Sequence, residues 1–181
     1  MKKISIITIL AATILFAQIG SCKTKMPRDE MYLGGLTNGS SIAEMKKIYG
    51  TPTEDGMGFE ENRMCRYGEG VLIKYNTLEE KIQSIIVTRD SGWVSPSGFR
   101  VGGNIRIVQN FYGNPEYSLS GDTKTVYIYF YGGRRKYEPE IGFLVLFDNN
   151  SGRILELGVH GDTTDEKFYK YYEDMAEKMV E

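Results

Sequence analysis

The sequence contains few of the residues that build most catalytic and metal centres. Its 181 residues include one histidine, His160, and two cysteines, Cys22 and Cys65. No second nitrogen ligand and no nucleophile with a base stands at a diagnostic spacing from His160, and no GxGxxG motif occurs. Two cysteines also cannot build the disulfide framework of a small secreted domain. We therefore expect a protein that is not an enzyme and that uses no cofactor and no metal ion.

Excess positive charge is missing as well. The chain has 22 basic and 24 acidic residues, a formal net charge of −2. Residues 1–21 hold two lysines and no acid, so the remaining chain has 20 basic against 24 acidic residues, a net charge of −4. A mildly acidic chain is poorly suited to contact a phosphate backbone. We expect no nucleic-acid partner.

The N-terminus has an apolar run, but one too short and too often interrupted for a membrane-spanning helix. Lys2 and Lys3 precede an apolar run from Ile4 to Ile19 that contains four polar residues and ends in "AQIGSC". A spanning helix needs about 20 consecutive apolar residues, whereas a secretory signal has this basic, apolar and small-residue order. Residues 1–21 are therefore predicted to be a signal peptide.

The end of this run resembles a bacterial lipobox. In Ile19-Gly20-Ser21-Cys22, an aliphatic and two small residues precede a cysteine. The resemblance implies lipid on Cys22, with residues 22–34 as a tether, and a membrane-anchored lipoprotein on the periplasmic or surface side of a bacterial envelope. The alternative is cleavage after Ser21 and secretion, with Cys22 left as a thiol or bridged to Cys65.

The same motif, Tyr-Gly-x-Pro, occurs twice in the chain, 63 residues apart. "YGTP" begins at Tyr49 and "YGNP" begins at Tyr112, and two glycines and one isoleucine upstream match at the same offset. In both places an N-cap residue, Ser41 or Asn104, starts a short apolar stripe of helical period. The glycine after each tyrosine then ends the helix, and the proline prevents its continuation. Two short helices, each ending at a Tyr-Gly pair, are predicted.

The segments after these helices also match. "YNTLEEKIQSIIV" at 75–87 aligns with "FDNNSGRILELGV" at 147–159, and both predict strand, tight turn and strand. The second segment starts like a calcium loop, but its twelfth position is Val159 instead of glutamate, which favours a plain turn. A unit of about 60 residues buries little surface alone, so two units are expected to pack together.

The expected fold class is α+β, with two tandem helix-plus-antiparallel-meander repeats followed by a C-terminal helix. The repeats would span residues 35–88 and 98–161, joined by a linker at 89–97. Residues 162–181 are predicted to form the helix, because Thr163-x-x-Glu166 is a capping box before an apolar stripe. The stripe consists of Phe168, Tyr171, Tyr172, Met175 and Met179. It could pack on its own domain or bind a partner.

The opening G-x-x-x-G-x-(S/N)-I pattern and the Y-G-x-P ending resemble the β-lactamase inhibitory protein fold. The single unit is similar to small outer-membrane lipoproteins of the BamE (SmpA/OmlA) type. The resemblance covers residues 35 to about 160. It implies non-catalytic protein binding, either by a concave sheet that holds an enzyme or by a lipoprotein that helps outer-membrane assembly. No inhibitory loop matching the family is found in this sequence.

The best candidate for a binding surface is the run "VYIYFY" at 126–131. Its period of two places Tyr127, Tyr129 and Tyr131 on one face of a strand, where tyrosines would suit protein recognition. The loop 132–140, with Arg134 and Arg135, would lie at the rim. In the alternative, the tyrosines pack against the helices. The predicted function is a lipid-anchored protein-binding module with an unidentified envelope protein as partner; the alternative is a secreted inhibitor of an enzyme.

Overall fold

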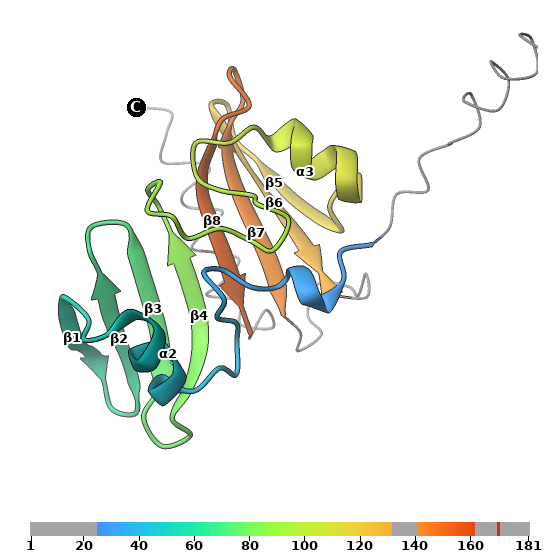
Figure 1. Cartoon of the computed structure of the whole chain (residues 1–181). Coiled ribbons are helices and arrows are strands. Elements are labelled where there is room, and N and C mark those ends of the chain that lie inside the picture. The colour runs from blue at the N-terminus through green and yellow to red at the C-terminus, as the bar shows by residue number, and fades with distance from the viewer. Residues whose placement is uncertain (1–24, 132–140, 162–169, 171–181) are drawn as a thin grey trace, which may run out of the picture.

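The computed structural model describes residues 25–131, 141–161 and 170. The strands in these ranges form one antiparallel sheet of eight strands in the order β1-β2-β3-β4-β8-β7-β6-β5 (Figure 1). The helices are η1 (Arg28–Glu30, a 3₁₀ helix), α2 (Ile42–Tyr49) and α3 (Ile105–Tyr112). The strands are β1 (Glu54–Phe59), β2 (Asn62–Tyr67), β3 (Val71–Asn76), β4 (Lys81–Val87), β5 (Tyr117–Ser120), β6 (Lys124–Phe130), β7 (Gly142–Asp148) and β8 (Ile154–His160). None of the helices in the described ranges has the length and apolar character needed to cross a bilayer.

The expected fold class, two tandem helix-plus-antiparallel-meander repeats with a C-terminal helix, is wrong. β4 pairs with β8 from Ser84↔His160 to Val87↔Leu157, so all eight strands belong to one continuous sheet. An unpaired strand edge leaves backbone hydrogen-bonding groups open, and pairing two such edges satisfies both. Local patterns do not show which distant strands will pair, so the sequence did not indicate this sheet. The helix expected at 162–181 lies outside the described residues, apart from position 170.

The predicted helix ends, in contrast, are confirmed. The Ser41 hydroxyl accepts a hydrogen bond from the Glu44 amide at 3.0 Å, and the Asn104 side chain accepts one from the Arg106 amide at 2.9 Å. Gly50 and Gly113 follow the two helices with φ of 74° and 77°. L-residues with a Cβ rarely adopt such angles, which explains glycine at both helix ends.

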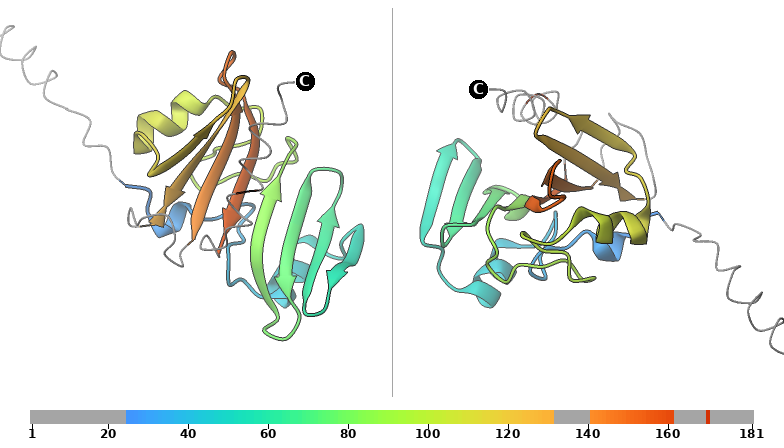
Figure 2. Two further views of the ribbon diagram at one scale, coloured as in Figure 1. Left: turned by 180° about the vertical axis from the view of Figure 1, so that it is seen from behind. Right: turned by 90° about the horizontal axis from the view of Figure 1, so that it is seen from above.

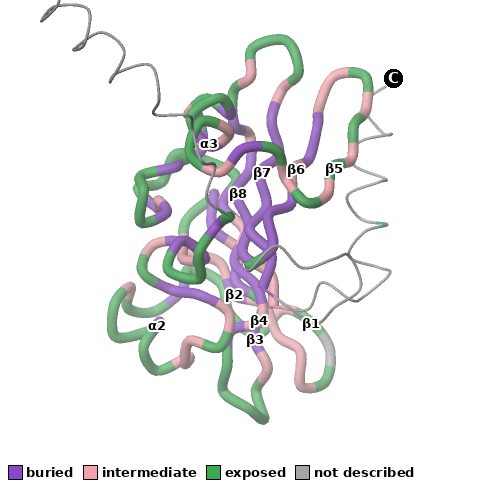
Figure 3. The backbone as a smooth tube through the Cα atoms, turned by 90° about the vertical axis from the view of Figure 1, so that its right-hand side faces the viewer, coloured by how far each residue is buried: buried purple, intermediate pink, exposed green. Residues whose placement is uncertain are grey.

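Both helices lie on one side of the sheet. Figure 2 shows α2, α3 and the connecting segments 25–41 and 88–104 grouped on the same side. Met45 of α2 and Val108 of α3 are fully buried there against strand residues such as Ile73 and Val145. We call this side the helix face and the opposite side the far face. Figure 3 shows burial concentrated in β6, β7 and β8, with exposed residues in the outer turns.

The N-terminal described segment is part of this core. Met26, Met31 and Leu33 are buried, and the Gly34 amide donates a hydrogen bond to the carbonyl of Val94 at 3.0 Å. The sequence predicts a tether at residues 22–34, but from Met26 onward the chain is packed against the fold. Its apolar residues are too few and too irregularly spaced to show a periodic pattern, which is why the sequence suggested a linker.

A buried carboxylate fastens this segment to the rest of the molecule. Glu30, with 3% of its surface exposed, accepts hydrogen bonds from the hydroxyls of Ser95, Ser97 and Tyr112. The Ser97 amide donates a further bond at 3.2 Å. A buried charge is tolerated only when hydrogen bonds replace its water. Glu30 thus connects η1 to the segment after β4 and to the end of α3.

Gly34 is the tightest point of this packing. It has φ of 59°, and the Tyr49 hydroxyl donates a hydrogen bond to its carbonyl. A Cβ at this position would meet that hydroxyl and would lie 2.6 Å from Cε3 of Trp93, whose ring stacks on Tyr49 at 4.1 Å between centroids. The neighbouring Gly35 has φ of 78°, but a Cβ there would have nothing within 4 Å.

We predict that Gly34→Ala lowers the free energy of unfolding much more than Gly35→Ala. Both substitutions incur the strain of a positive φ, about 1–2 kcal/mol. Gly34→Ala adds overpacking against Trp93 and Tyr49, about 1–3 kcal/mol more. Urea unfolding of the two variants measures the difference. Equal losses of stability would show that this contact is not tight.

Candidate functional site

The alternation of side chains divides each strand between the two faces. In β3, Val71, Ile73 and Tyr75 are buried in the core on the helix face. Leu72 and Lys74 point to the far face, because successive side chains in a strand project to opposite sides. An antiparallel sheet with helices on one face offers its other face for contacts.

The predicted tyrosine site does not lie on the far face. Tyr129 is 1% exposed, and its hydroxyl donates a hydrogen bond to the Gly113 carbonyl at the end of α3 at 3.1 Å. Tyr127 is partly buried on the same side, with its ring 4.8 Å from that of Phe147. The expectation that they form an open surface is therefore wrong. The tyrosine ring can be buried here because a helix-terminal carbonyl satisfies its hydroxyl.

The remaining predicted site residues are only partly described. Tyr131 follows β6, is 39% exposed and has the guanidinium carbon of Arg28 5.9 Å from its ring centroid. Arg134 and Arg135, expected at the rim of the site, and Cys22, the expected lipid attachment point, lie outside the described residues. Among the described site residues, Tyr127 and Tyr129 lie together, with ring centroids 6.4 Å apart, but on the helix face.

The far face carries two regions of different character. Over β6 and β7, beyond the terminal pair Lys124 and Asp148, its side chains are apolar and no more than 3% exposed; we call this apolar group the apolar patch. It consists of Val126, Ile128, Phe130, Leu144 and Leu146. Over β2, β3 and β4 five side chains are half-buried or exposed and include two cations; we call these five the mixed patch. It consists of Met64, Arg66, Leu72, Lys74 and Ile86.

The strand register makes the mixed patch continuous. Arg66 lies opposite Leu72, which lies opposite Ile86, so one row crosses three strands. Met64 lies opposite Lys74 in the next row. Directly opposed side chains in an antiparallel pair are about 5 Å apart at Cβ, so the side chains within each row are in contact. The patch combines three apolar side chains with two positive charges, and it reaches solvent.

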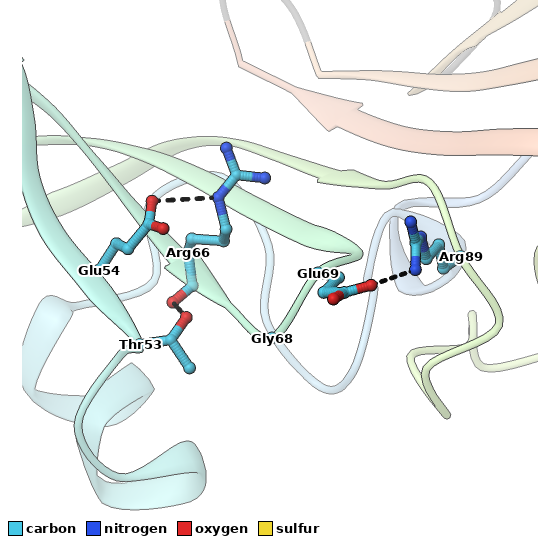
Figure 4. A pocket seen from close by; sticks show the side chains of 6 residues that line it. All are labelled: Thr53, Glu54, Arg66, Gly68, Glu69 and Arg89. Carbon is cyan, nitrogen blue, oxygen red and sulfur yellow. Dashed lines mark hydrogen bonds and ion pairs between the residues drawn. The ribbon is translucent and has the colours of Figure 1, made fainter.

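A shallow polar hollow lies beside the mixed patch, with a volume of about 500 Å³ (Figure 4). Arg66 belongs to both, and its Nε is 3.3 Å from a carboxylate oxygen of Glu54. On the other side of the hollow, Arg89 pairs with Glu69. The hollow is lined by Thr53, Glu54, Arg66, Gly68, Glu69 and Arg89. Because its charges are exposed and paired with each other, it lacks the enclosed apolar wall of a small-molecule site.

His160 lies on the far face where the two halves of the sheet meet. A Cβ on Gly158 would be 3.0 Å from Nε2 of His160 and 3.4 Å from Cβ of Leu144, so the imidazole packs against the bare glycine backbone. Burial, and then the nearby positive charge of Lys74, lower the pKa of His160 to about 3. The imidazole is therefore neutral at physiological pH. Asp162, near it in sequence, lies outside the described residues.

Two further side chains considered for chemistry, Cys65 and Asp148, lie among the described residues. Burial, and secondarily the Asp55 carboxylate, raise the pKa of the Cys65 thiol to about 11, so little thiolate forms at neutral pH. Asp148, in the loop considered for calcium, accepts 2.7 Å hydrogen bonds from the amide and hydroxyl of Ser151. Across the described ranges, no three His, Cys, Asp or Glu residues are grouped to hold a metal ion.

The sequence-based reasoning missed the mixed patch. The sequence contains an indication of this patch. In "VLIKYN" successive side chains lie on opposite faces of the strand, which separates Leu72 and Lys74 from Val71 and Ile73. A lysine on one side of a strand indicates the face that reaches water. The tyrosine run was predicted as the binding surface because its aromatic residues resemble those of protein interfaces. The period of two does not show which face of the strand the helices cover.

Comparison with known proteins gives a likeness in fold alone. No protein-family model matches this sequence, and no curated protein does either. A cysteine-rich secretory protein from Staphylococcus aureus subsp. aureus Mu50 superposes with a TM-score of 0.53 at 16% identity, over 75% of this chain and 48% of that one. An extracellular protein containing an SCP domain from Bacillus anthracis str. Ames gives a TM-score of 0.47 at 12% identity, over 70% of this chain and 44% of that one.

This chain thus spans about half the length of each of the two proteins, and their names describe the whole molecules. The likeness to the Staphylococcus aureus protein supports the sheet architecture. The comparisons do not bear on lipid attachment.

The lowered pKa of His160 has a measurable consequence. Because His160 is the only histidine, its Hε1 ring proton gives a single assignable NMR signal. We predict that this signal does not titrate between pH 7.5 and pH 5 in the folded protein, since the folded pKa is about 3. Titration near the ordinary value of 6.5 would contradict the packing against Gly158.

The same shift predicts how stability depends on pH. Between pH 6.5 and pH 3 the unfolded chain binds a proton at His160 that the folded protein does not bind. The free energy of unfolding should therefore fall as the pH falls through this range. A His160→Gln variant should show a shallower decrease, because carboxylates alone then contribute to it.

Proposed function

We propose that this chain is a lipid-anchored protein of the bacterial envelope that binds another protein, without catalysis, through the mixed patch. The observation that carries the proposal is a solvent-reaching sheet face on which Leu72, Ile86 and Met64 adjoin Arg66 and Lys74. Apolar side chains beside cations suit an interface with an apolar centre and a polar rim. The partner's surface should be apolar and acidic.

Two observations support the lipid anchor. The Ile19-Gly20-Ser21-Cys22 sequence resembles a lipobox, and the fold is already packed at Met26. Only residues 23–25 would separate the lipid from the packed chain, a reach of about 14 Å when fully extended. A lipid on Cys22 would therefore hold the domain close to the membrane surface, where an envelope partner can meet it.

The anchor is tested by mass spectrometry of the mature protein from a bacterial host. We expect a mature chain that begins at Cys22 and carries acyl groups, recovered with the membrane fraction. A Cys22→Ala variant is the control and should lack both the added mass and the membrane association. An unmodified Cys22 thiol would overturn the anchor and favour the alternative, a secreted inhibitor of an enzyme. The resemblance to the β-lactamase inhibitory protein and BamE folds stays a prediction in either case.

The binding surface is tested by site-specific photocrosslinking in the native envelope. A photoreactive benzoylphenylalanine is placed at Leu72 or Ile86 in the mixed patch, or at Leu78 as the control. Leu78 is 82% exposed in the turn between β3 and β4, away from the patch. We expect the same discrete adduct from positions 72 and 86 and none from position 78.

Charge reversal completes this experiment. Combining the probe at Ile86 with Arg66→Glu and Lys74→Glu should weaken the adduct strongly, because Arg66 lies in the same row as the probe and Lys74 lies in the next row. An adduct of equal strength from position 78, or no adduct from either patch position, would show that the mixed patch is not the interface.

A further inference from the structure

The apolar patch is shielded from water, although it lies on the side of the sheet without the two helices. Its five residues are no more than 3% exposed, and the partly buried side chains packed against them, Tyr117, Leu119 and Leu155, belong to the same sheet. Both helices and both connecting segments lie on the helix face. Among the described residues, no helix or connecting segment lies over this part of the far face.

We propose that residues 162–181 of this chain form an amphipathic helix that covers the apolar patch. The segment begins directly after β8, whose neighbour β7 carries Leu144 and Leu146. Its starting point is fixed, because the Gly161 amide donates a hydrogen bond to the Gln83 carbonyl at 3.0 Å. The chain therefore leaves the sheet next to the surface that needs a cover.

The segment has the right length. A helix of about 15 residues is about 22 Å long. The distance from β8 across β7 and β6 to β5 is three interstrand spacings, or about 14 Å. One helix from this segment is therefore long enough to cross all strands that contribute to the patch.

Its side chains also have the right pattern. The stripe of Phe168, Tyr171, Tyr172, Met175 and Met179 lies on one side of a helix of period 3.6. Lys170, the one described residue of the segment, is helical and exposed, and it falls on the side opposite the stripe. The loop at 132–140 is a poor alternative, because "GGRRKYEPE" has five charged residues and one aromatic.

The proposal goes beyond the proposed function and does not depend on it. If the chain covers the apolar patch itself, the far face left for a partner is the mixed patch alone. A loss of the C-terminal segment would expose a second, strongly apolar surface beside it.

Photocrosslinking within the purified mature chain tests the cover directly. Benzoylphenylalanine replaces Tyr172 on the stripe, or Lys170 on the opposite side as the matched control. After irradiation, peptide mass spectrometry should find crosslinks within one chain from position 172 to residues 126–130 or 142–148, and none from position 170. Crosslinks to these strands between two chains would identify a second copy as the occupant and overturn the proposal. So would crosslinks to other regions, or their absence.

A second pair of variants provides an independent measurement. Met175→Asp should lower the midpoint of thermal unfolding by roughly 10 °C, because it places a charge against the apolar patch. It should also increase the fluorescence of a dye that binds exposed apolar surface. Lys170→Asp introduces the same residue on the exposed side and should change neither. Equal behaviour of the two variants would contradict the proposed helix orientation.

Discussion

The pairing of β4 with β8 is the constraint on which the rest of the structure depends. Four residue pairs, from Ser84↔His160 to Val87↔Leu157, join two four-stranded groups into one sheet. This ladder places α2 and α3 on the same side, so that their buried residues belong to one core. It also makes the far face continuous from β2 to β6. Gly158 at this junction leaves room for the His160 ring, which a side chain would displace.

The continuous far face has two regions whose side chains differ in polarity. Over β6 and β7, apart from the terminal pair Lys124 and Asp148, it presents apolar side chains, which the folded protein keeps from water. Toward β2 and β3 it presents Arg66 and Lys74, which keep that region in contact with solvent. Burial of the cations would require paired charges, whereas the apolar region gains from any cover. One sheet can therefore carry both an internal packing surface and an external binding surface.

The helix face shows how buried polar groups hold distant parts of the chain together. Glu30 joins η1 to Ser95, Ser97 and Tyr112, and the Tyr129 hydroxyl reaches the carbonyl of Gly113. The Tyr67 hydroxyl makes the equivalent contact with the Gly50 carbonyl at 2.9 Å. Each contact joins residues at least 16 positions apart, so no short-range pattern predicts it. This is why the tyrosines were assigned to a binding surface and residues 22–34 to a tether.

The sequence by itself determined the local elements, because caps, glycines with positive φ and alternating side chains act over a few residues. Ser41, Asn104, Gly50 and Gly113 marked both helices correctly. Only the tertiary structure decided that the strands form one sheet, that Tyr129 is core, and that the mixed patch reaches solvent. These outcomes depend on which strand edges meet and which face the helices cover. Such choices are made by contacts between residues far apart in the chain, whose energies the local pattern does not contain.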